Sequence, residues 1–282
     1  MFETKPFEEL TTDERERARE LIRNTRTDSP VVGSNEGNLD GDDGSVAVDV
    51  YNKIKRITAE RKEVVPEIKH WLQHNVVRQL LKRYANYRYL SADESTKFID
   101  SEEFVFFPLQ FFRESRVTVR AKPFYNQSWL VEYLFRSVPA GYELAVKDHP
   151  QQLGSQPRSC IDAIARHSTA LHPGTNAHDV VEEASAIVTL NNTVGYEALI
   201  HGKPVVTLGD AFYSHRGYTY DVNNMTSLPE TLADAVASDG LTESEVVEFA
   251  HGILSGSVPG VWGDPADGNV RRLATSIIEY IA

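Results

Sequence analysis

The chain has 282 residues and a mass of 31.6 kDa, enough for one complete α/β domain and a smaller region, because a domain usually takes roughly 100–200 residues. Its 41 acidic and 29 basic residues give a net charge of −12, which argues against nucleic-acid binding because a polyanion would be repelled. The single cysteine, Cys160, excludes an internal disulfide and a zinc site built on several thiolates, and we expect a reducing compartment.

The N-terminal segment is charged and short of apolar residues. Met1–Leu10 carries Glu and Lys, so we expect no signal peptide, and no stretch reaches the ~18–20 apolar residues that span a bilayer. We therefore expect a cytoplasmic protein, attached at most to the inner face of the cell membrane. The next segment, Thr11–Thr25, predicts a helix with a thin apolar stripe and with Thr12 as its N-cap.

A polar loop and a basic helical region complete the first hundred residues. Residues 28–45 are rich in Gly and Asp and predict a solvated loop. A second helical region runs from about Val46 to Tyr89, with a break near Pro66. The segment from Lys53 to Arg88 contains ten basic and three acidic residues, which gives it a local net charge of +7 (10 minus 3).

The basic region has two interpretations. With its interleaved aromatic residues it fits a surface that contacts anionic lipid headgroups or an anionic acceptor. Alternatively it is a solvated helix face whose aromatic side chains pack on the main domain, and we favour this second interpretation. The aromatic residues are Trp71, Tyr84, Tyr87 and Tyr89.

From Glu103 onward, short apolar runs alternate with helical segments. The predicted strands are Phe104–Leu109, Tyr142–Val146, Ser168–Leu171, Ile187–Leu190 and Pro204–Leu208. The predicted helices are Trp129–Phe135, Arg158–Arg166, Asp179–Ala184 and Val194–Ile200, followed by helices near Pro229–Val236, Glu243–Leu254 and Asn269–Ile281. This alternation predicts an α/β fold with a doubly wound, Rossmann-like parallel sheet over residues 101–282, preceded by a helical N-terminal region over residues 1–100.

In such a sheet, ligands bind beyond the carboxyl ends of the strands. The residues directly after each apolar run are therefore candidates for a site, and four places qualify. They are Gln110, the segment Lys147–Pro150, the segment Asn191–Gly195 and the segment Gly209–Tyr213.

The segment Asn191–Ala198 (NNTVGYEA) carries the strongest signal. Its small polar residues, with Gly195 in the first helical turn, would place backbone N–H groups and the Thr193 hydroxyl around an anion, most plausibly a phosphate. Asn192 and Thr193 also fit ordinary helix caps without a ligand. Glu197 lies one turn further, where its carboxylate would accept two ribose hydroxyls or, alternatively, would simply be exposed on the helix.

Two His-Pro pairs follow strands. In Lys147-Asp148-His149-Pro150 the imidazole is held by the rigid bond to proline and would contact a nucleotide base or phosphate, with Lys147 adding positive charge. His172-Pro173 also follows an apolar run, and we interpret it as part of a generic loop.

The order FFPLQ, VKDHP, NNTVGYEALIHGKPVVTLG and AFY resembles the capsular polysaccharide biosynthesis family, over about Phe104–Val222. That family contains GT-B glycosyltransferases, including those that transfer 3-deoxy-octulosonic acid (Kdo) from CMP. The resemblance implies a GT-B C-terminal-type domain that uses a nucleotide-activated sugar, with a CMP-linked sugar expected, in capsule or surface polysaccharide biosynthesis.

The resemblance also implies roles for single residues. His149 and Pro150 match the nucleotide-contacting His-Pro pair, Asn192 and Thr193 match the pair that holds the donor phosphate, and Glu197 matches the ribose-binding glutamate. Gln110 matches the Gln of a Pro-Leu-Gln signature, and Tyr213 matches the aromatic residue after the last strand. No metal and no cofactor beyond the donor are expected, because the helix N-terminus and basic side chains neutralise the leaving nucleotide.

One departure from the family concerns the acceptor. A GT-B enzyme has a second Rossmann-like domain for the acceptor, here a polysaccharide or glycolipid, and the first hundred residues do not predict a second sheet. We expect a second chain that supplies this domain, or the helical N-terminal region in its place, or a non-catalytic remnant or partner subunit of a transferase. A CDP-glycerol-type glycerophosphotransferase is a further alternative. No residue is assigned as general base; the carboxylates considered are Asp28, Asp40, Asp42 and Asp43.

Overall fold

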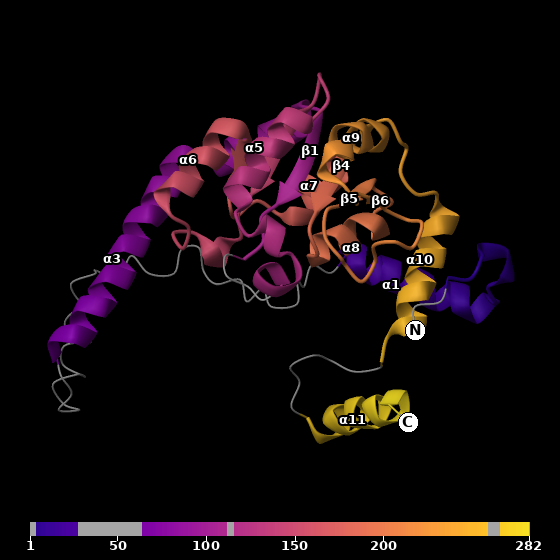
Figure 1. The fold of residues 1–282 in the computed structure, drawn as a ribbon. Coiled ribbons are helices and arrows are strands. Elements are labelled where there is room, and N and C mark those ends of the chain that lie inside the picture. The colour runs from indigo at the N-terminus through magenta and orange to yellow at the C-terminus, as the bar shows by residue number, and fades with distance from the viewer. Residues whose placement is uncertain (1–3, 28–63, 112–115, 259–265, 282) are drawn as a thin grey trace. The chain divides into compact units, whose positions relative to one another are not determined.

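The structure is a computed structural model that describes residues 4–27, 64–111, 116–258 and 266–281 (Figure 1). The chain forms two compact units, Met1–Asp28 with Leu241–Ala282, and Ser29–Gly240, and each is described by itself. The division expected at residue 100 falls within the second unit, so the helices that directly precede the sheet belong to the same unit as the sheet. The loop predicted at residues 28–45 lies outside the described residues.

The second unit is built on a six-stranded sheet in the order β3-β2-β1-β4-β5-β6, in which every neighbouring pair is parallel. The strands are β1 (Phe104–Pro108), β2 (Glu143–Lys147), β3 (Thr169–Leu171), β4 (Ala186–Thr189), β5 (Val205–Thr207) and β6 (Tyr220–Asp221). This order is that of a doubly wound sheet, which grows in one direction from β1 to β3 and in the other from β4 to β6. The predicted Rossmann-like fold is therefore confirmed.

The five predicted strands agree with the structure to within one residue at each end. The sixth strand was not predicted. Its two residues, Tyr220 and Asp221, are only partly buried and belong to no apolar run, so neither the length nor the pattern of a strand was present in the sequence.

Helices cover both faces of the sheet. Three of them, α5 (Gln127–Ser137), α6 (Arg158–His167) and α9 (Leu228–Val236), lie on one face, and α7 (Ala177–Glu183) and α8 (Thr193–Ile200) lie on the other (Figure 1). All five residues of β1 are buried, because a central strand with helices on both sides has no face in contact with water. The continuous apolar run of β1 is the sequence signature of this position.

The described part of the N-terminal hundred residues is helical, as predicted. In the second unit it contains α3 (Val64–Arg88) and α4 (Ala92–Ser101), and α4 begins with a capping box between Ser91 and Glu94. Near Pro66, where the sequence predicted a break, α3 begins at Val64, and the part of the region before Val64 lies outside the described residues. Proline is tolerated in the first helical turn, because the N–H group that it lacks has no intrahelical partner there.

Helix α3 packs against α6 through its C-terminal half. The Tyr84 hydroxyl donates a hydrogen bond to the Asp162 carboxylate, and the Arg158 guanidinium lies over the Tyr84 ring, 4.8 Å from its centroid. Tyr89 is buried, whereas Tyr87 is 83% exposed. The packing interpretation of the basic region is thus confirmed for Tyr84 and Tyr89, and the side chains of residues 53–75, Trp71 included, lie outside the described residues.

The first unit consists of helices. Helix α1 (Thr12–Thr27) packs against α10 (Glu243–Gly256) and buries Ala18 and Ile22, and the unit also contains η1 (Phe7–Glu9) and α11 (Asp267–Ile281). The Glu248 carboxylate accepts a hydrogen bond from the Phe7 N–H at 2.7 Å, which ties the N-terminal segment to α10.

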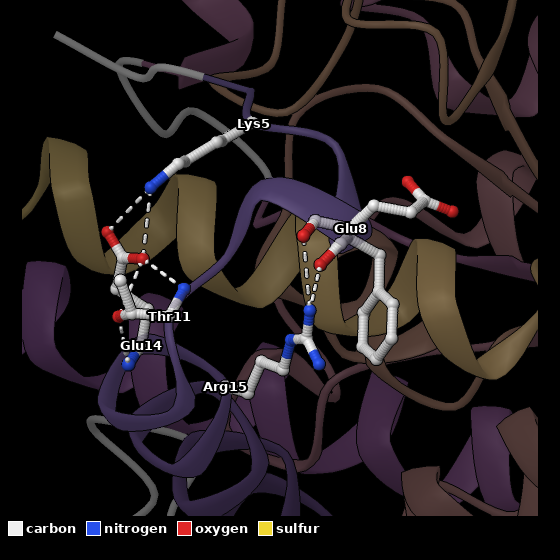
Figure 2. A network of polar contacts seen from close by, with 6 residues as sticks. Lys5, Glu8, Thr11, Glu14 and Arg15 are labelled. Carbon is white, nitrogen blue, oxygen red and sulfur yellow. Dashed lines mark hydrogen bonds and ion pairs between the residues drawn. The ribbon is translucent and has the colours of Figure 1, made fainter.

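A polar network closes the N-terminal end of α1 (Figure 2). The cap is Thr11, where the sequence had predicted Thr12: the Thr11 hydroxyl accepts from the Glu14 N–H at 3.3 Å, and the Glu14 carboxylate accepts from the Thr11 N–H at 2.7 Å. Lys5 pairs with the same carboxylate at 3.0 Å. This reciprocal capping box gives hydrogen-bond partners to backbone N–H groups that the start of a helix otherwise leaves unpaired.

Candidate functional site

Parallel pairing brings the predicted site residues to one edge of the sheet. Because all six strands run in the same direction, their carboxyl ends share an edge, and the strand order places the segments after β3, β2, β1, β4 and β5 side by side there. The strand order reverses between β1 and β4. Gln110 follows β1 and Asn192 follows β4, so these two predicted residues flank the position where doubly wound sheets bind their ligands.

The turn from β4 into α8 is organised by Asn192. Its side-chain Oδ1 accepts from the Gly195 N–H at 3.3 Å and from the Thr189 hydroxyl at 2.8 Å, and its Nδ2 donates to the Pro108 carbonyl at 3.5 Å. Asn192 is therefore the N-cap of α8 and also joins the ends of β4 and β1. Its side-chain oxygen is already engaged within the protein.

Tyr213 packs against the buried side of the same turn. Its side chain is completely buried, and its hydroxyl donates to the Asn192 carbonyl at 2.7 Å. Gly195 makes this packing possible, because a Cβ at that position would collide with the Tyr213 hydroxyl. Tyr213 and Gly195 therefore lie beneath the turn and position Asn192 and Thr193. Neither exposes a side chain that a ligand would contact.

Thr193 and Glu197 differ in exposure. Thr193 is the first residue of α8 and is exposed at the positive end of the helix. Glu197 is only 8% exposed, so it is not the exposed helix glutamate that the sequence left open. Within the described residues its carboxyl group has no hydrogen-bond or ion-pair partner, and burial raises its pKa to about 7.

Lys147 ends β2 as a partly buried cation. Within the described part of the chain its ammonium group makes no hydrogen bond and no ion pair, and burial lowers its pKa to about 8, an effect that the neighbouring Asp148 carboxylate partly offsets. Asp148 itself is buried, which raises its pKa to about 6. The Asp148 carboxylate is held by the Gln152 and Gln156 amides, at 3.3 and 3.2 Å.

His149 is fixed by its own turn. Its Nδ1 accepts from the Gln151 N–H at 3.2 Å, and Pro150 begins the short helix η4 (Pro150–Gln152). The Phe111 ring packs against the imidazole with 4.4 Å between ring centroids. Burial and the Lys147 charge lower the His149 pKa, so at neutral pH the ring carries one proton, on the Nε2 atom that the turn leaves free.

Gln110 lies in a buried amide network that the sequence did not predict. Gln127 at the start of α5 binds both backbone groups of Gln110, accepting from its N–H at 2.7 Å and donating to its carbonyl at 3.0 Å. Gln152 donates to the same carbonyl at 3.0 Å. The Gln110 side chain is buried, and its Nε2 has no partner within the described residues. Sequence patterns miss such a network because its glutamines belong to three separate segments.

His172 follows β3 beside Lys147. In the register of the two strands, Leu171 is opposite Lys147, so His172 lies one residue beyond that pair. It is partly buried, and burial and the Lys147 charge lower its pKa. The sequence had assigned this residue to a generic loop, since the pairing of β3 with β2 is not visible in a pattern of apolar residues.

The described residues contain neither a metal-binding cluster nor a membrane-spanning helix. No cluster of three or more His, Cys, Asp or Glu side chains in the described ranges has an arrangement suited to a metal ion. No helix among the described residues has the length and apolar character needed to cross a bilayer. The carboxylates Asp40, Asp42 and Asp43, and Asp28, lie outside the described residues.

Parts of the chain are similar to known proteins. Over 134 residues the chain is 32% identical to protein FixF of Sinorhizobium fredii, an alignment that covers 46% of this chain and 32% of FixF. Over 97 residues it is 34% identical to the capsule polysaccharide export protein KpsS of Escherichia coli, covering 32% of this chain and 25% of KpsS. The chain therefore matches between a quarter and a third of the length of these relatives.

A solved structure is also similar. It is KpsC of Thermosulfurimonas dismutans, described as a beta Kdo 2,7 transferase, with a TM-score of 0.37, 19% sequence identity, and coverage of 62% of this chain and 66% of that chain. The model of the capsule polysaccharide biosynthesis protein family matches residues 51–242, which include the whole sheet and all the site residues described above. The chain belongs to the capsule polysaccharide biosynthesis protein family.

Proposed function

We propose that the second unit binds a nucleotide-activated sugar, with a CMP-linked sugar as the expected donor, and that the protein acts as a glycosyltransferase in the synthesis of a capsule or another surface polysaccharide. One observation carries the proposal. Three polar groups at or near the carboxyl edge are buried or partly buried and have no partner within the described residues: the Lys147 ammonium, the His149 Nε2–H and the Glu197 carboxyl. Burying such groups unpaired is costly, so a ligand that pairs with them would be bound.

The chemistry of a nucleotide donor fits these groups. Lys147 and His149 would donate to phosphate oxygens, and the N-terminus of α8 with the Thr193 hydroxyl would add the partial positive charge of the helix end. Glu197 would accept hydrogen bonds from ribose hydroxyls. Asn192, whose oxygen is engaged in capping, would hold the turn in shape and leave the phosphate to its neighbours.

The proposed reaction is a glycosyl transfer. The bond between the anomeric carbon and the donor phosphate oxygen breaks, the nucleotide leaves with the electron pair, and an acceptor hydroxyl forms the new bond and loses its proton. Lys147 and the α8 N-terminus would stabilise the charge that develops on the departing phosphate, which is why the proposal requires no metal. The same proposal includes an acceptor, which is a polysaccharide or glycolipid, and a second chain that binds this acceptor.

Calorimetric titration of the full chain with CMP, UDP and CDP-glycerol tests the donor class. We expect CMP to bind and UDP to bind more weakly, and we expect Glu197→Gln to weaken CMP binding while the circular dichroism spectrum stays the same. A folded protein that binds none of the three compounds would contradict the proposal. Tighter binding of CDP-glycerol, with transfer of glycerol phosphate, would instead assign a glycerophosphotransferase.

A further inference from the structure

Two His-Pro turns of the same construction lie next to each other at the carboxyl edge. In the first, the Gln151 N–H donates to His149 Nδ1 at 3.2 Å and the Gln152 N–H donates to the His149 carbonyl at 2.9 Å. In the second, the Gly174 N–H donates to His172 Nδ1 at 3.1 Å and the Thr175 N–H donates to the His172 carbonyl at 3.0 Å. Each turn thus fixes its imidazole by the same two backbone bonds.

These bonds determine where each imidazole carries its proton. A neutral imidazole has one N–H and one acceptor nitrogen, and a nitrogen that accepts a backbone hydrogen bond cannot carry the proton. Nδ1 is the acceptor in both rings, so Nε2 is the donor in both. Neither Nε2 has a partner within the described residues, and both rings are partly buried. Two oriented N–H donors therefore remain available to a ligand.

Lys147 is the last residue of β2, and the register of the sheet brings it close to the start of both turns. It is two residues before His149 on β2 and opposite Leu171 of β3, the residue before His172. Neighbouring strands are only ~4.8 Å apart, so the segments that follow paired residues start close enough to contact one ligand. The Lys147 charge acts on both imidazoles, in agreement with this proximity.

We propose that His172 is a ligand-binding residue, and that its Nε2–H, the His149 Nε2–H and the Lys147 ammonium together form a subsite for an oxyanion. One cation and two neutral donors suit a phosphate or a carboxylate, whereas a neutral ligand would leave the lysine charge unpaired. The inference rests on the proposed function for the identity of the anion, which is the donor phosphate or the carboxylate of an acidic sugar. The oxyanion subsite itself can be tested without a nucleotide.

Substitutions of His172 can remove the Nε2–H group and the Nδ1 acceptor of the turn one at a time. In His172→Asn the side-chain oxygen takes the place of Nδ1 and can still accept from the Gly174 N–H, but the Nε2–H is lost. In His172→Gln a side-chain N–H takes the place of the Nε2–H, but the acceptor of the turn is lost. His167→Asn is the matched control, because His167 is also partly buried but ends α6 away from the carboxyl edge.

The first probe is inorganic phosphate, titrated into the full chain at constant ionic strength and followed by the ¹⁵N resonances of the imidazoles. We expect the Nε2 resonances of His149 and His172 to move together, and His172→Asn to weaken phosphate binding about tenfold, since a hydrogen bond to a charged group contributes that much or more. His172→Gln should retain most of the affinity, and His167→Asn all of it. Unchanged phosphate affinity in His172→Asn, or a resonance shift of His149 alone, would overturn the proposal.

A second set of titrations identifies the source of the anion. If the phosphate of the donor occupies the subsite, His172→Asn weakens CMP binding and leaves cytidine binding unchanged. If a sugar carboxylate occupies it, the variant weakens binding of free Kdo and leaves CMP binding unchanged. Binding of inorganic phosphate that depends on His172, in a protein that binds no nucleotide, would refute the proposed function and leave the oxyanion subsite standing.

Discussion

Replacement of Lys147 by methionine is expected to make the ligand-free protein more stable. Methionine is close to lysine in length and has no charge, so Lys147→Met keeps most of the packing of the side chain and removes an ammonium group that no described residue pairs with. Burying a charge without a partner disfavours the folded state. Function and stability thus oppose each other at this position, as they often do at binding sites.

The size of the effect follows from the pKa of Lys147. Burial lowers it from the ordinary 10.5 to about 8, and each pKa unit corresponds to about 1.36 kcal/mol, so the charged lysine costs the folded state about 3 kcal/mol at pH 7. This is an upper value, because the side chain is partly exposed. Between pH 8 and 10.5 the folded protein holds fewer protons than the unfolded chain, so the stability of the wild type rises with pH and the cost falls to about 1 kcal/mol at pH 9.5.

Urea denaturation of both proteins at pH 7 and at pH 9.5 measures this difference. Lys147→Met should be more stable than the wild type at pH 7, and the gap should shrink by more than half at pH 9.5. Lys203→Met, at a partly buried lysine in the turn between α8 and β5, controls for the exchange of lysine for methionine itself. A Lys147→Met protein that is less stable at pH 7, or whose advantage does not depend on pH, would refute the claim that this lysine is unpaired.

Four other substitutions test further features of the same unit. Burial raises the Glu197 pKa from 4.5 to about 7, so the wild type should lose about 2–3 kcal/mol relative to Glu197→Gln as the pH rises from 5 to 8, and parallel stability curves in urea would contradict this. Gly195→Ala should cost about 1–3 kcal/mol because its Cβ meets the Tyr213 hydroxyl, and Tyr213→Phe should recover part of that loss in a double-mutant cycle; full additivity would rule out the contact. Tyr84→Phe removes the bond to Asp162, so it should cost about 1–2 kcal/mol and speed proteolysis within α3, and an unchanged cleavage rate would show that other contacts hold this helix.

The sequence by itself determined the order and type of five of the six strands and of the helices between them. Apolar runs such as Phe104–Leu109 and Ile187–Leu190 alternate with helical segments, and the period of apolar residues is a local property that can be read without knowing what a segment packs against. Parallel strands follow from that alternation, and they bring the residues after each strand to one edge. The sequence therefore located Gln110, Lys147 and Asn192 at the carboxyl edge, where the structure has them.

Only the tertiary structure decided which polar groups are paired and which are available. In the sequence Asn192 fitted either a phosphate contact or a helix cap, and the structure shows that it is the cap, whereas Tyr213, predicted as a ligand-contacting residue, is buried beneath the turn. For Glu197 the alternative was an exposed helix residue, but its side chain is buried and its carboxyl group has no partner within the described residues. His172 became a neighbour of Lys147 through the pairing of β3 with β2. Burial and pairing depend on residues far away in the chain, so a local pattern cannot contain them.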